Sequence, residues 1–221
     1  MVNILLELYN IDANWISCEL KKYIKPEHKV AVIAFSFRDH MVHDSHDWDL
    51  LYGKNTGKYY SGIVNSLCFY GIPEENITFV NYFTDTEASA AEKIAQADII
   101  YFPGGLPDRM MDRIKEFNLY DILLNHDGIV MGYSAGALIQ LTDYHLSPDK
   151  DYSAFGYYKG LPYLDGFYLE VHYESSDVQN ASIRRVTQER KVPVYAPHFG
   201  RGAIIAENGV IRTVGEVEVF R

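Results

Sequence analysis

The stretch Gly132 to Gly136 carries the residue types that nucleophilic catalysis requires. It reads Gly-Tyr-Ser-Ala-Gly, with Ser134 at its centre and a glycine two positions away on either side. An apolar run, 129–131, precedes it, and residues 135–141 are compatible with a helix. This context is typical of a nucleophile elbow, a sharp strand-to-helix turn on which only small neighbours let the backbones pass. N–H groups at the start of the helix then face negative charge that develops near the serine.

A second glycine pair predicts an oxyanion hole for this serine. Gly104-Gly105 follows the apolar strand predicted at 98–102, so we expect it at the carboxyl edge of the sheet beside the elbow. Because glycine has no side chain, a backbone N–H at this point can approach a substrate oxygen closely. We therefore predict that the N–H groups of Gly105 and Ala135 together hold the oxyanion.

The general base should be a histidine at the carboxyl end of another strand. His172 ends the strand predicted at 167–172 and is our choice, whereas His198, which follows Pro197, is the competitor. The other six histidines lie in predicted loops or at the amino end of a strand: His28, His40, His43, His46, His126 and His145.

The acid that orients the base is less sharply indicated by the sequence. Asp149 and Asp151 lie in the loop after the elbow helix and are the best placed. Asp143, Glu170 and Glu174 stay open as alternatives.

Two further groups of residues could contact a ligand. Arg184 and Arg185, on the helix predicted at 177–189, could bind a substrate carboxylate through their forked guanidinium groups. The run from His40 to Asp47 contains residue types that suit zinc, but its spacing matches no familiar site. We therefore predict a solvated loop there, and no metal ion or other cofactor.

Composition limits the class of protein. The 221 residues are 48% hydrophobic and 23% charged, as in ordinary globular proteins. A formal net charge of −10 argues against a nucleic-acid partner or an anionic membrane surface. We find neither a secretory signal nor a long apolar segment, and we expect Cys18 and Cys68 to be free thiols. These features predict a cytoplasmic protein.

The apolar runs predict alternating strands and helices in a single α/β domain over residues 1–221. We expect a doubly wound, mostly parallel sheet with helices on both faces and an antiparallel C-terminal ribbon, whose turn is Asn208-Gly209. The strands are predicted at 2–8, 29–37, 77–80, 98–102, 129–131, 167–172, 192–196, 203–206 and 210–214, and the helices at 14–23, 57–70, 87–96, 107–124, 135–141 and 177–189. The segment 149–165, rich in Tyr, Gly and Pro, is predicted as a long loop or short strands.

The hexapeptide Gly-Tyr-Ser-Ala-Gly-Ala at 132–137, with Gly104-Gly105 upstream and His172 downstream, resembles the S51 serine peptidases. That family includes α-aspartyl dipeptidase and cyanophycinase and shares the class I glutamine-amidotransferase-like fold. The resemblance implies Ser134 as nucleophile, His172 as base and an acid in the loop between them. Family members commonly carry an amide or acid after the double glycine, whereas this chain carries Leu106.

Together these features predict a serine hydrolase that cleaves a small peptide or amide through an acyl-enzyme on Ser134. Its partner would be that small substrate, with no nucleic acid and no membrane, and a homodimer stays open. Two alternatives remain: an α/β-hydrolase-type esterase with His198 as base, and a non-catalytic binding protein on the same fold.

Overall fold

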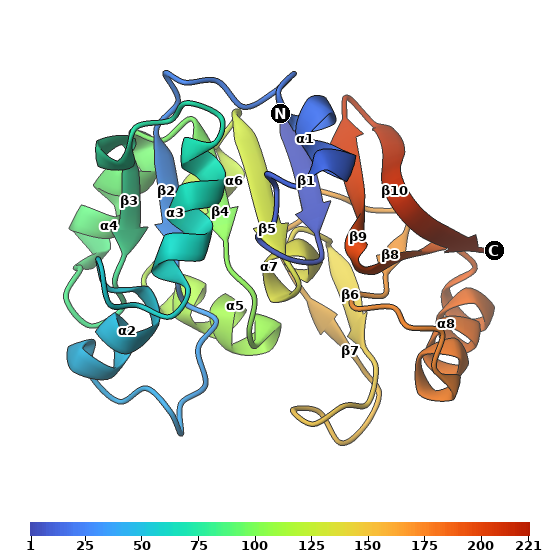
Figure 1. Cartoon of the computed structure of the whole chain (residues 1–221). Coiled ribbons are helices and arrows are strands. Elements are labelled where there is room, and N and C mark those ends of the chain that lie inside the picture. Colours follow the sequence, from blue (N-terminus) through green and yellow to red (C-terminus); the bar gives the residue numbers. More distant parts are fainter.

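A single eight-stranded sheet runs through the molecule. The computed structural model describes all residues, 1–221, and orders the strands β10-β9-β1-β5-β4-β2-β3, with β8 paired to β9 outside this path (Figure 1). The strands of this sheet are β1 (Val2–Leu6), β2 (Val30–Ile33), β3 (Ile77–Val80), β4 (Ile99–Phe102), β5 (Ile129–Tyr133), β8 (Tyr168–Leu169), β9 (Val194–Glu207) and β10 (Val210–Phe220). β1 to β5 pair in parallel, so their carboxyl ends meet at one edge.

Helices cover both faces of the parallel strands because those strands are apolar on both sides. Each face has a core of 26 buried residues. One core contains side chains of α1 (Asn14–Leu20), α2 (Ser45–Tyr52) and α3 (Tyr60–Cys68). The other contains side chains of α4 (Glu87–Ala95), α5 (Pro107–Glu116), α6 (Tyr120–Leu124) and α7 (Ala135–Leu138). None of the helices combines the length and apolarity that crossing a membrane requires.

The C-terminal strands form the predicted antiparallel ribbon. β9 pairs antiparallel with both β1 and β10, and Asn208 and Gly209 make the turn between β9 and β10. Both turn residues have positive φ, 51° and 78°, as a tight hairpin turn requires. The fold class predicted from the sequence, a mostly parallel α/β sheet with an antiparallel C-terminal ribbon, is thus confirmed.

Several elements differ from the sequence prediction. The 3-10 turn η1 (Glu74–Asn76) and helix α2 were not predicted, and α2 begins at Ser45, inside the run expected to be a loop. The Asp44 side chain caps α2 by accepting a hydrogen bond from the Asp47 N–H. β6 (Asp143–Leu146) was not predicted; it pairs with β7 (Gly156–Lys159), one of the short strands expected within 149–165, in a separate two-stranded sheet. α7 and β8 are shorter than expected, and α8 (Asp177–Arg190) packs beside β9.

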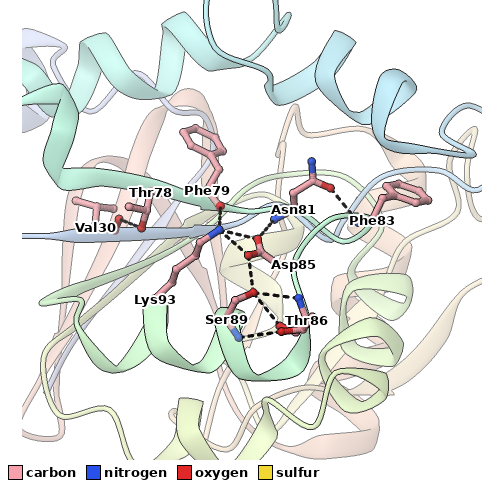
Figure 2. Close-up of polar contacts among 9 residues, drawn as sticks. All are labelled: Val30, Thr78, Phe79, Asn81, Phe83, Asp85, Thr86, Ser89 and Lys93. Carbon is pink, nitrogen blue, oxygen red and sulfur yellow. Dashed lines mark hydrogen bonds and ion pairs between the residues drawn. The ribbon is translucent and has the colours of Figure 1, made fainter.

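A polar network fixes the connection from β3 to α4 (Figure 2). Lys93 of α4 donates to both carboxylate oxygens of Asp85, at 2.7 and 2.6 Å, and to the Phe79 carbonyl at 3.0 Å. Ser89 donates to Asp85 and exchanges hydrogen bonds with Thr86 in a capping box. The charged groups of Asp85 and Lys93 are thus paired with each other and with neighbouring polar groups, which is the pattern of a structural ion pair.

Candidate active site

The elbow expected around Ser134 has the strained backbone that such a turn requires. Ser134 lies between β5 and α7 with φ 53° and ψ −114°, a conformation that non-glycine residues rarely adopt. A Cβ on Gly132 would lie 2.4 Å from the Gly136 carbonyl oxygen, and one on Gly136 would lie 1.9 Å from the Phe102 carbonyl oxygen. Only glycine fits at either position, so the G-x-S-x-G pattern here is a packing requirement.

His172 lies beside this serine. Its Nε2 is 2.7 Å from the Ser134 Oγ, within hydrogen-bond reach for proton transfer. His172 follows β8 in a segment outside the strand and has a positive φ of 54°. The Gln179 side chain, in the first turn of α8, donates to the His172 carbonyl at 2.9 Å and so holds this segment in place.

The carboxylate beside His172 belongs to Glu7. Its Oε2 is 3.2 Å from the His172 Nδ1, an ion-pair contact that is not aligned as a hydrogen bond, and it also accepts from the His172 backbone N–H. Glu7 is 1% exposed, and burial raises the pKa of its carboxyl above the ordinary value although the neighbouring His172 opposes this. Such an acid can fix the imidazole and stabilise it when it is charged.

Glu7 takes this place because of the order of the strands. It directly follows β1, which pairs in parallel with β5 so that Leu6 is opposite Tyr133. The Ser134 N–H donates to the Leu6 carbonyl at 2.9 Å, which ties the end of β1 to the elbow. The acid and the nucleophile therefore lie side by side at one edge of the sheet.

Neither Asp149 nor Asp151 is the carboxylate next to His172, which corrects the sequence expectation. The Arg38 guanidinium pairs with Asp151 and, through this contact above all, lowers the pKa of the Asp151 carboxyl. Asp149 accepts from backbone N–H groups within its own turn. Both lie at the tip of the β6–β7 hairpin, a unit that sequence patterns did not resolve.

The three alternative acids also lie elsewhere or have other partners. Asp143 pairs with Lys159 of the facing strand. Glu170 pairs with the buried His145 at 2.6 Å, and Glu174 is exposed.

The glycine pair expected to form the oxyanion hole lies against the elbow. A Cβ on Gly104 would be 3.3 Å from the Ser134 Cβ, and Gly105 has a φ of 144° that favours glycine. The N–H groups of Gly105 and Ala135 donate to no acceptor within the protein, so both are available to a ligand oxygen.

Ser36, which follows β2, holds this glycine loop. Its Oγ donates to the Gly104 carbonyl at 2.6 Å, and its own carbonyl accepts from the Leu106 N–H at 2.8 Å. Ser36 is fully buried, and a Cβ on Gly105 would come within 2.2 Å of its carbonyl oxygen. These contacts fix the backbone of the loop.

The other residues singled out from the sequence have no contact with Ser134. The Nε2 of His198 is 2.9 Å from Glu218 of β10, so it does not face the elbow. Arg185 pairs with Glu189 of its own helix and lies over the Phe155 ring, and Arg184 is exposed on α8. No group of three or more His, Cys, Asp or Glu side chains is arranged to hold a metal ion, and His43 instead contacts Asp47.

A cavity of about 410 Å³ lies away from this site. It is lined by residues that include Met1, Asp98, His126 and Gly128, which precede β1, β4 and β5. These residues mark the amino edge of the sheet, whereas Ser134 follows β5 at the carboxyl edge. The chemistry of the site therefore has to take place outside this cavity.

Sequence reasoning missed Glu7 and Ser36. A signal for Glu7 was present, because it is an ionisable residue within the apolar run Leu-Leu-Glu-Leu. A carboxyl group that is buried at the end of a strand needs a hydrogen-bond or ion-pair partner. Ser36 offered no comparable signal, because a serine directly after an apolar run is an ordinary loop residue.

Comparison with known proteins identifies the family of the chain. The model of peptidase family S51 matches residues 59–215, more than half of the chain and including the elbow and His172. Comparison with curated protein sequences found no match.

Two solved structures are similar across nearly the whole chain. A putative peptidase E protein from Listeria monocytogenes EGD-e superposes with a TM-score of 0.67 at 16% identity, covering 97% of this chain and 98% of that one. A peptidase from an acI-B1 actinobacterium gives a TM-score of 0.62 at 13% identity, covering 99% and 88%. At these identities the likeness establishes the fold.

Proposed function

Because the chain belongs to peptidase family S51, we propose that it is a serine peptidase that cleaves a small peptide or amide through an acyl-enzyme on Ser134. The observation that carries the proposal is the 2.7 Å contact of the Ser134 Oγ with the His172 Nε2, with the Glu7 carboxylate behind the imidazole. In this proposal Ser134 is the nucleophile, His172 the base and Glu7 the acid that orients the base.

In the proposed acylation step, His172 Nε2 takes the proton of the Ser134 hydroxyl as the oxygen attacks the substrate carbonyl. The carbonyl oxygen becomes negatively charged and accepts hydrogen bonds from the N–H groups of Gly105 and Ala135. The Glu7 carboxylate stabilises the imidazolium. The tetrahedral intermediate then collapses, the C–N bond breaks, and His172 returns its proton to the leaving amine.

Deacylation repeats these steps with water. His172 takes a proton from a water molecule as the water oxygen attacks the ester carbonyl. The same two N–H groups hold the oxyanion, and Ser134 leaves with the proton returned by His172. The products are the free acid and the regenerated enzyme.

A short substrate is favoured by the contacts around the site. The tip of the β6–β7 hairpin is tied to two segments at the carboxyl edge of the sheet: Asp151 pairs with Arg38 after β2, and the Tyr152 hydroxyl donates to Asp108 in α5. Arg38 is two residues from Ser36, which holds the oxyanion loop. These ties hold the hairpin tip against the segments that follow β2 and β4, and we infer that it hinders access of a folded protein more than that of a dipeptide or small amide.

Labelling with a fluorophosphonate tests the nucleophile. We expect the probe to modify wild-type protein at Ser134, located by mass spectrometry, and Ser134→Ala to remove the label without changing the melting temperature. A panel of dipeptides and aminoacyl amides then identifies the substrate class by release of the amine. Labelling of Ser134→Ala at another serine, or no labelling of wild type, would contradict the proposal.

A further inference from the structure

One exposed aromatic side chain contacts the proposed triad. Phe199 is 44% exposed, and its ring centroid lies 5.0 Å from that of His172 at an interplanar angle of 69°. The chain has seven large apolar side chains with high exposure. Among them, Phe199 packs on His172 of the proposed triad. The set is Met1, Met41, Leu50, Phe69, Val178, Phe199 and Val210.

The backbone around Phe199 is tied to both segments that build the triad. The Phe199 N–H donates to the carbonyl of Tyr173, the residue after His172, at 3.4 Å. The Asn10 side chain, three residues after Glu7, donates to the Gly200 carbonyl at 3.3 Å. Gly200 has a φ of 69°, the left-handed conformation that lets β9 bend here. Phe199 is therefore held in place beside His172 rather than on a loose loop.

The chemistry of the proposed reaction places the leaving amine next to His172. Its Nε2 must come within about 3 Å of the amine nitrogen to return the proton. The first carbon and the side chain of the leaving residue are one and two bonds further away. A ring packed against the imidazole and open to solvent lies within reach of that side chain.

We propose that Phe199 forms an apolar subsite for the leaving fragment, so that the preferred leaving amine carries an aliphatic or aromatic side chain. This inference rests on the proposed function, because it takes the leaving group to be protonated by His172. Contact with such a side chain removes apolar surface of both partners from water. Added methylene groups in an apolar subsite change specificity by about 10- to 200-fold.

Competition between leaving fragments and a covalent probe tests this subsite. The rate of Ser134 phosphonylation by a fluorophosphonate is measured with increasing glycine amide, leucine amide or phenylalanine amide. In the wild-type protein we expect leucine and phenylalanine amides to halve the rate at concentrations about tenfold lower than glycine amide. Phe199→Ala should abolish this difference, and Phe199→Leu should keep most of it.

Phe69→Ala is the matched control, because Phe69 is 48% exposed and its ring packs against Tyr70 and Lys21. It should leave the tenfold preference unchanged. An unchanged preference in Phe199→Ala would overturn the subsite. An equal loss of protection by all three amides would also overturn it, because that result would mean that Phe199 only positions His172. Failure of wild type to react with the probe refutes the proposed function itself, and the inference with it, so the two failures are distinguishable.

Discussion

Two of the three histidine–glutamate pairs in the chain have a buried glutamate, and these two differ in their surroundings. In one, His145 Nε2 lies 2.6 Å from Glu170, and the two side chains are 0% and 5% exposed. In the other, His172 Nδ1 lies 3.2 Å from Glu7, with the glutamate 1% and the histidine 40% exposed. The residue types are the same, but only the second histidine is open to solvent.

The contacts of the two imidazole rings show why this difference in exposure matters for proton transfer. His145 Nδ1 is buried without a partner, and the ring packs against Phe155 and Tyr168, so no substrate can reach it. The Nε2 of His172 faces Ser134 instead. The fully buried His145–Glu170 pair can only link structural segments. The His172–Glu7 pair, with a buried acid and an accessible base, can transfer a proton.

The largest effect should come from removing the accessible base. His172→Ala should lower kcat by about 10⁴-fold or more, since members of a triad act as a unit. His198→Ala is the matched control and should stay within a few-fold of wild type, because His198 faces Glu218. Steady-state rates on a cleaved dipeptide, or phosphonylation rates of Ser134, give the comparison. The reverse order of effects would make His198 the base and rule out this triad.

Replacing the buried acid should have the next largest effect. Glu7→Gln keeps the shape of the side chain but removes the charge that stabilises the imidazolium, and we expect kcat to fall by about 10²- to 10⁴-fold with the protein still folded. Asp151→Asn, which removes the acid favoured by the sequence, should change kcat by no more than a few-fold. A larger loss in Asp151→Asn than in Glu7→Gln would restore the aspartate as the functional acid.

The buried His145–Glu170 pair should affect stability rather than activity. His145→Ala leaves the buried Glu170 side chain with Ser147 as its remaining side-chain donor, and removing one partner of a buried hydrogen bond costs about 1–3 kcal/mol. Urea unfolding measures the loss, and labelling of Ser134 per folded molecule should stay near the wild-type rate. Loss of labelling in a variant that is still folded would mean that His145 also supports the chemistry.

The smallest effect is a pH dependence of stability that arises from Glu7. Burial raises its pKa in the folded protein above the ordinary value of 4.5, so the protonated carboxyl is the form that folding favours. The stability from this group is fully present below about pH 4.5 and is lost as pH rises through the raised pKa. Urea unfolding of wild type and Glu7→Gln across this range should show wild type losing stability relative to the variant. A relative gain for wild type would show that His172 outweighs burial.

Local patterns were sufficient for most of the fold. Continuous apolar runs such as 30–33 and 99–102 are strands buried on both faces, and the Asn208-Gly209 turn fixes the C-terminal hairpin. Elements that depend on contacts with distant residues were missed or mispredicted. The β6–β7 sheet pairs strands across a long hairpin, and β8 has only two residues because the strand ends at Leu169, before His172.

Within the candidate site, the sequence by itself determined the elbow, because its five residues are contiguous and its two glycines are required by backbone contacts within one turn and one neighbouring strand. It also indicated His172 as a residue near a strand end. Only the tertiary structure decided which carboxylate lies beside His172. Glu7 lies beside His172 because β1 inserts between β5 and β9, and this order comes from burial over the whole sheet rather than from any local pattern.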